Sequence, residues 1–156
     1  MNYATIKDCD IANGPGVRVS LFVSGCTRGC PGCFNKPAQD FHYGSPFTSE
    51  VEDRVVGMVS RSYIKGLSLL GGDPLEPCNR DALLPLLRRL RSELPDKDVW
   101  CWTGYSLEDL TRHNDQEFLS LIDVLVDGPF VQELKDVSLL WKGSSNQRVI
   151  SMRSRG

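Results

Sequence analysis

Hydrophobic residues recur along this chain in two alternating patterns. Short runs rich in β-branched and aromatic residues predict strands at 17–23, 66–70, 98–102 and 124–126, with 148–150 as a fifth. Between these runs, apolar residues return every three or four positions, which predicts amphipathic helices. Strand and helix therefore alternate along the sequence.

The predicted helices begin at polar residues that favour helix N-termini. These are Ser49 with Glu52 as a capping box, Asn79, and Ser106 with Asp109. The second helical stretch contains Pro85, whose missing N–H predicts a kink or a later helix start. We expect the third stretch to break near Asn114.

The alternation of strands and helices predicts an α/β fold. Right-handed strand–helix–strand units place strands in parallel and pack helices against the sheet. A closed eight-stranded barrel needs about 250 residues, and this chain has 156 with no internal repeat. We therefore expect a single domain over residues 1–156, an incomplete, open TIM-like β/α barrel with parallel strands and helices on the outer face.

Composition narrows the class of protein. The formal net charge of -2 argues against a dedicated nucleic-acid or polybasic membrane binder, because both need an excess of positive charge. Apolar runs stay far below the ~20 residues of a membrane span. The N-terminus lacks the basic-then-apolar pattern of a signal peptide, so we expect a cytoplasmic protein.

Unusual segments follow each of the first four predicted strands. They are 24–34, which is rich in Cys and Gly, then 71–74, 103–105 and 127–130. Because the carboxyl ends of parallel strands meet at one edge of a sheet, these segments should lie together. We predict the active site at that edge.

Three cysteines in the first of these segments, Cys26, Cys30 and Cys33, have the spacing C-x3-C-x2-C. A reducing compartment makes such a cluster a metal or catalytic site rather than a set of disulfides. A closed zinc site would need a fourth ligand, such as His42 or Cys9. The ferredoxin run C-x2-C-x2-C-x3-C-P is absent from the sequence. The favoured interpretation is a 4Fe-4S cluster with three protein ligands and one open iron.

The remaining cysteines, Cys9, Cys78 and Cys101, stand alone. We expect them to be ordinary thiols, with Cys101 in the core.

The cysteine motif followed by Phe34 resembles the signature of the radical S-adenosylmethionine (radical SAM) enzymes. Five further segments make the chain similar to the glycyl-radical activases that serve anaerobic ribonucleoside-triphosphate reductase, which are related to the pyruvate formate-lyase activating enzyme. These segments are 13–18, 71–75, 102–105, 126–130 and 143–147. The resemblance extends from about residue 2 to about residue 150.

The resemblance implies a set of site residues. Cys26, Cys30 and Cys33 would bind the 4Fe-4S cluster, and the remaining positions would contact S-adenosylmethionine. The implied contacts are Gly32, Cys33 and Phe34 at the adenine, Gly71, Gly72 and Asp73 at the methionine amino group, and Thr103, Gly104 and Asp127 near the ribose and methionine. Asp73 stands where the superfamily usually has Glu, so we rely more on the backbone contact at Gly72.

The resemblance also implies a reaction and partners. An electron from a flavodoxin-type donor would enter the cluster, and S-adenosylmethionine would be cleaved to methionine and a 5′-deoxyadenosyl radical. That radical would take hydrogen from a backbone glycine of the anaerobic ribonucleoside-triphosphate reductase. Because cofactors carry this chemistry, we expect no side chain to act as a general base.

Alternatives remain open from the sequence. Activation of pyruvate formate-lyase or another glycyl-radical enzyme is the nearest one. A zinc-stabilised binding module and an electron-transfer iron-sulfur protein are alternatives of a different class.

Overall fold

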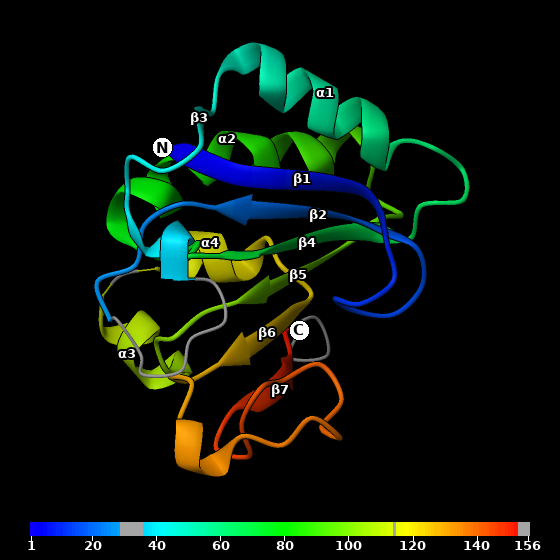
Figure 1. The fold of residues 1–156 in the computed structure, drawn as a ribbon. Coiled ribbons are helices and arrows are strands. Elements are labelled where there is room, and N and C mark those ends of the chain that lie inside the picture. Colours follow the sequence, from blue (N-terminus) through cyan, green and yellow to red (C-terminus); the bar gives the residue numbers. More distant parts are fainter. Residues whose placement is uncertain (29–35, 114, 153–156) are drawn as a thin grey trace.

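A computed structural model describes residues 1–28, 36–113 and 115–152. These residues form a seven-stranded sheet in the order β3-β1-β2-β4-β5-β6-β7. In Figure 1 the strands follow one another from β1 near the top to β7 near the bottom.

The centre of the sheet is parallel. It contains β2 (Arg18–Val23), β4 (Gly66–Gly71), β5 (Asp98–Trp102) and β6 (Val124–Asp127). Each pairs in parallel with the next. The four strands predicted from the sequence and their parallel order are confirmed.

The edges of the sheet are antiparallel, which corrects the prediction of parallel strands throughout. β1 (Asn2–Asp10) pairs antiparallel with β2, and the two-residue β3 (Ser45–Pro46) pairs with β1. β7 (Arg148–Ser151) pairs antiparallel with β6. β1 was missed because its sequence is polar and half exposed, and its position depends on pairing with β2. The architecture is α/β with an open, mixed sheet.

The two faces of the central strands have different environments. Odd-numbered residues such as Val19, Leu21 and Leu69 belong to the hydrophobic core that the helices cover. Because side chains alternate along a strand, the even-numbered residues lie on the opposite face. That face carries Arg18, Ser20, Phe22, Ser68, Leu70, Trp100 and Trp102.

In the part of the chain that the structure describes, four α-helices connect these strands. They are α1 (Ser49–Val59), α2 (Pro77–Glu93), α3 (Leu107–Arg112) and α4 (Gln116–Ser120). Their apolar residues join the core on the odd-numbered face, and Figure 1 shows α2 and α4 behind the strands. Two short 3-10 helices, Lys36–Gln39 and Gln132–Leu134, lie in the loops.

Helix ends differ in part from the sequence prediction. The N-cap of α1 is Thr48, whose side chain accepts from the Val51 N–H, so the capping box at Ser49 was wrong. The capping box of Ser106 and Asp109 at α3 is confirmed.

α2 also differs from the prediction in two respects. Asn79 is not its cap but lies inside the helix, which starts at Pro77. The helix also runs through Pro85 without a break. The carbonyl that loses its partner belongs to Asp81, and both residues are exposed, so water can satisfy it.

Within the described ranges, none of the helices has the length and apolar character that crossing a membrane would require.

Candidate active site

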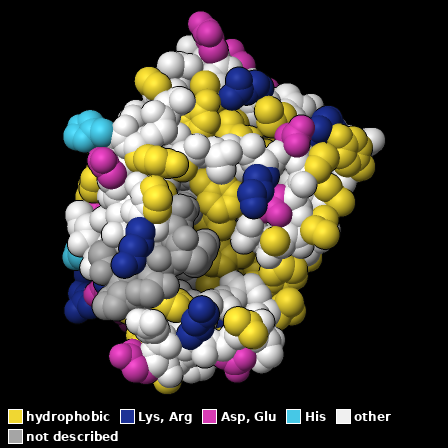
Figure 2. All heavy atoms as spheres, viewed as in Figure 1, with side chains coloured by type: hydrophobic (Ala, Val, Ile, Leu, Met, Phe, Trp, Pro, Cys, Tyr) yellow, Lys and Arg dark blue, Asp and Glu magenta, His cyan; other side chains and the backbone are white. Residues whose placement is uncertain are grey.

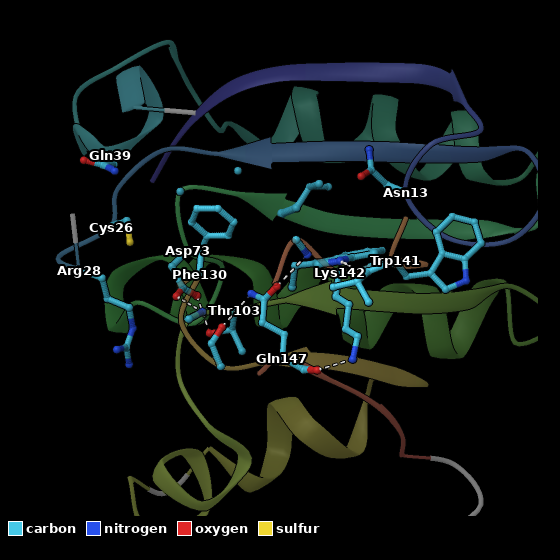
Figure 3. Close-up of a pocket in the computed structure, with 18 of the residues that line it drawn as sticks. Asn13, Cys26, Arg28, Gln39, Asp73, Thr103, Phe130, Trp141, Lys142 and Gln147 are labelled. Carbon is cyan, nitrogen blue, oxygen red and sulfur yellow. Dashed lines mark hydrogen bonds between the residues drawn. The ribbon is translucent and has the colours of Figure 1, made fainter. Parts of the chain in front are cut away.

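A cavity of about 350 Å³ lies on the even-numbered face of the sheet. One end lies at the carboxyl ends of β2, β4 and β5, where Cys26, Asp73 and Thr103 line it. The other end is lined by Asn13 and by Trp141 from the segment between β6 and β7. Figure 3 shows these side chains around the cavity, and Figure 2 shows hydrophobic side chains lining the hollow on this face.

Most of the described site residues predicted from the sequence meet at this cavity. Those lining it are Cys26, Gly71, Gly72, Asp73, Thr103 and Gly104. Four others, Cys30, Gly32, Cys33 and Phe34, lie outside the described residues. The expectation that parallel strand ends gather these segments is confirmed for the described ones.

Asp127 has other partners. Its carboxylate accepts from the Leu107 N–H (2.8 Å) and from Arg148 Nε (3.0 Å). It therefore supports the start of α3 and holds the final strand, while the neighbouring Gly128 lines the cavity. A contact between Asp127 and a cofactor stays a prediction.

Cys26 follows β2 in a loop held by backbone hydrogen bonds. The Gly25 N–H donates to the Ala38 carbonyl (2.7 Å) and the Cys26 N–H to the Gln39 carbonyl (3.1 Å). These bonds fix the residue at the cavity wall. Cys101, by contrast, is buried in the core, and Cys9 and Cys78 are exposed.

The Cys26 thiol is a ligand type that suits an iron-sulfur cluster. Among those residues, no three His, Cys, Asp or Glu side chains come together in a group that could hold a metal ion. Cys26 is a thiol at the cavity wall, and Cys30 and Cys33 follow it at ligand spacing. Cys30 and Cys33 lie outside the described residues, so their role as ligands stays a prediction.

Asp73 lines the cavity and is almost fully buried, with 1% of its surface exposed. Its Oδ1 accepts from Thr103 Oγ1 (2.8 Å) and the Leu75 N–H (2.9 Å), and its Oδ2 from the Gly104 N–H (2.8 Å). Burial raises the pKa of Asp73 to about 6, because desolvation outweighs the effect of these donors.

Gly72 lies where the loops after β2 and β4 touch. Its N–H donates to the Val23 carbonyl (2.8 Å), and the next N–H, that of Asp73, donates to the Gly25 carbonyl (2.8 Å). A Cβ at Gly72 would lie 2.6 Å from the carbonyl oxygens of Gly25 and Ala38. No larger residue fits without moving the loop that carries Cys26.

Comparison with known proteins agrees with this geometry. A family model described as a 4Fe-4S single cluster domain matches residues 12–150. The chain is 51% identical over 155 residues to the anaerobic ribonucleoside-triphosphate reductase-activating protein of Escherichia coli K12, covering 98% of this chain and 100% of the relative. The protein of the same name from Enterobacteria phage T4 is 43% identical over 151 residues, covering 97% and 94%. The chain belongs to the family of anaerobic ribonucleoside-triphosphate reductase-activating proteins.

In this member of the activating-protein family, two buried polar residues support the site in ways that sequence reasoning missed. Glu76 accepts from the Thr27 N–H (3.0 Å) and Thr27 Oγ1 (2.8 Å), beside Cys26. Asn79 Nδ2 donates to the carbonyls of Ser24 (3.0 Å) and Asp73 (2.9 Å). Both lie at the start of α2, where a polar residue is ordinarily interpreted as a cap.

Two cations, Arg28 and Lys142, contribute positive charge to the cavity wall. The Arg28 guanidinium lies over the Tyr105 ring, 4.5 Å from its centroid. Lys142 Nζ donates to the Gln147 carbonyl (2.9 Å). These charges favour a ligand that carries a carboxylate.

Proposed function

We propose that this protein activates an anaerobic ribonucleoside-triphosphate reductase by generating a glycyl radical on it. The observation that carries the proposal is the cavity in which Cys26 meets Gly71, Gly72 and Asp73. Similarity to activating proteins over nearly the whole chain supports the same function.

The proposed cofactors are one 4Fe-4S cluster, held by Cys26, Cys30 and Cys33, and S-adenosylmethionine. When bound, the reduced cluster supplies the electron that splits the sulfonium C–S bond, giving methionine and a 5′-deoxyadenosyl radical. The proposed contacts with S-adenosylmethionine are Gly32, Cys33 and Phe34 for the adenine, and Gly71 and Gly72, with Asp73 beside them, for the methionine end. Thr103, Gly104 and Asp127 are proposed to lie near the ribose and methionine.

The chain's own residues then orient S-adenosylmethionine and exclude water. The backbone carbonyls of Gly71 and Gly72 are acceptors suited to an ammonium group. The positive charges of Arg28 and Lys142 complement the carboxylate of S-adenosylmethionine. Leu70, Trp102 and Phe130 give the cavity an apolar wall, which limits competing reactions of a radical with solvent.

We further propose that residues 1–156 act as one radical SAM domain, and that its sheet is an incomplete barrel. Its unclosed side would admit the glycine loop of the reductase. A flavodoxin-type protein in the cytoplasm would deliver the electron.

The test is anaerobic reconstitution with iron and sulfide, followed by dithionite, S-adenosylmethionine and the reductase. We expect 5′-deoxyadenosine and a glycyl radical signal on the reductase by electron paramagnetic resonance. Cys26→Ala should lose both products and most of the bound iron, whereas Cys78→Ala, at an exposed position, should keep them.

Each contrary outcome has a distinct meaning. A cluster without 5′-deoxyadenosine would indicate an electron carrier, and bound zinc in place of iron would indicate a binding module. A radical that forms on pyruvate formate-lyase instead of the reductase would overturn only the choice of partner.

A further inference from the structure

We propose that Asp73 is a positioning residue, which joins the loops after β4 and β5 and does not itself bind the methionine ammonium group of S-adenosylmethionine. The inference rests on the proposed function and deepens it. It concerns how the strand-end loops recognise that ligand.

The first support is that both oxygens of the Asp73 carboxylate are already engaged. Three donors reach it: Thr103 Oγ1, the Leu75 N–H and the Gly104 N–H, all within 2.9 Å. A carboxylate offers about four lone-pair sites, and 1% of this residue's surface remains exposed. An ammonium group brings three N–H donors, and the buried carboxylate has little left to offer them.

The second support is the direction in which the side chain turns. Asp73 accepts from the N–H two residues ahead, at Leu75, across Pro74. This is the local turn that short Asp side chains form with their own backbone. The superfamily's Glu has one more methylene, whereas this shorter side chain turns back toward its own loop and the β5 end.

The third support is the set of loops that meet at this one residue. Thr103 Oγ1, which donates to Asp73, also accepts from the Tyr105 N–H (3.1 Å), so the turn after β5 is held at two points. On the β2 side, the Asp73 N–H donates to the Gly25 carbonyl (2.8 Å). Asp73 thus fixes the spacing of the loops that end β2, β4 and β5.

This arrangement divides the roles at the site. The carboxylate keeps the Gly104 loop in place, and the Asp73 carbonyl already accepts from Asn79 Nδ2 (2.9 Å). The backbone carbonyls of Gly71 and Gly72 are then the acceptors proposed for the ammonium group. Loss of the carboxylate should therefore weaken binding of any ligand that fills this end of the cavity, whether or not the ligand carries an amino group.

The experiment is a binding cycle on the cluster-loaded protein, with Asp73→Asn and two ligands. The ligands are S-adenosylmethionine and its analogue with hydrogen in place of the α-amino group. We expect Asp73→Asn to raise both dissociation constants by the same factor, about tenfold or more, with unchanged iron content. An Asp73→Asn effect that disappears with the deamino analogue would mean direct contact with the ammonium group and would overturn the proposal.

Two further variants keep the test decisive if Asp73→Asn folds poorly. Thr103→Val removes a donor to the carboxylate and should weaken both ligands equally, and Thr103→Ser should restore binding. Unchanged binding in Thr103→Val would contradict the proposal. Asp96→Asn, at an exposed position, is the matched control and should bind both ligands like wild type.

The same measurements separate this proposal from the proposed function. If wild-type protein with a full cluster fails to bind S-adenosylmethionine, the function itself is wrong. If wild type binds it and the two ligands respond differently to Asp73→Asn, only the positioning role is wrong.

Discussion

Arg18 carries a full charge in a place with no exposure to solvent. Its guanidinium donates to Ser68 Oγ (2.7 Å), to the carbonyls of Pro15 (3.1 Å) and Leu67 (3.0 Å), and to Asp98 (2.5 Å). Arg18 therefore holds together the amino ends of β2, β4 and β5, opposite the strand ends that form the site. Arg18 belongs to the 13–18 segment, one of those that carry the family resemblance. Its role there is structural.

Replacement of Arg18 by Met should reduce the free energy of unfolding by about 3–5 kcal/mol, because it removes the donor to Ser68 Oγ, the Leu67 carbonyl and Asp98 from a buried network. The measurement is urea denaturation. Arg88→Met is the matched control, since Arg88 forms an exposed pair with Glu117 and its loss should cost less than about 1 kcal/mol. Equal losses in the two variants would refute this account of Arg18.

At the scale of elements, the position of a helix in the sequence was easier to predict than its first residue. Ser49 and Thr48 are adjacent and both suit an N-cap. The chain reaches Thr48 in an extended conformation, and its side chain accepts from the Val51 N–H. The direction from which the chain enters α1 determines which of these two residues is the N-cap.

Thr48→Ala should lower the free energy of unfolding by about 1 kcal/mol, since it removes an N-cap hydrogen bond. Ser49→Ala, one position inside the helix, should change it by less than half of that amount. Thermal or urea denaturation of both variants provides the comparison. A larger loss in Ser49→Ala would restore the cap predicted from the sequence.

At the scale of the whole molecule, the sheet has helices on one face and a cavity on the other. Strand ends that are far apart in sequence meet at one end of this cavity, and the segment between β6 and β7 borders it through Trp141. Trp102 Nε1 donates to the Trp141 carbonyl (2.6 Å), which ties that segment to β5. Ligand binding should therefore stabilise the fold as a unit.

We expect S-adenosylmethionine at about 100 times its dissociation constant to raise the free energy of unfolding of the cluster-loaded protein by about 2.7 kcal/mol. Anaerobic thermal denaturation with and without the ligand measures this effect. Cys26→Ala, without a complete cluster, should show a much smaller rise. An equal rise in Cys26→Ala would mean that binding does not depend on the cluster.

The part of the site that could be predicted from the sequence consists of residues that come directly after parallel strands. Cys26, the 71–73 segment and the turn at Thr103 and Gly104 come directly after parallel strands, and parallel pairing brings them together. Glu76 and Asn79 were not predictable, because each acts through a contact with a loop about fifty residues away.

The sequence by itself determined the α/β class, the four parallel strands and the edge at which the site lies. It could do so because hydrophobic periodicity and turn residues are local properties of the chain. The tertiary structure alone decided the antiparallel edges β1 and β7, the N-cap at Thr48 and the partners of Asp73 and Asp127. Each of these depends on which residues that are distant in sequence come within hydrogen-bond distance, about 3 Å. The local pattern of hydrophobic and polar residues carries no information about such contacts.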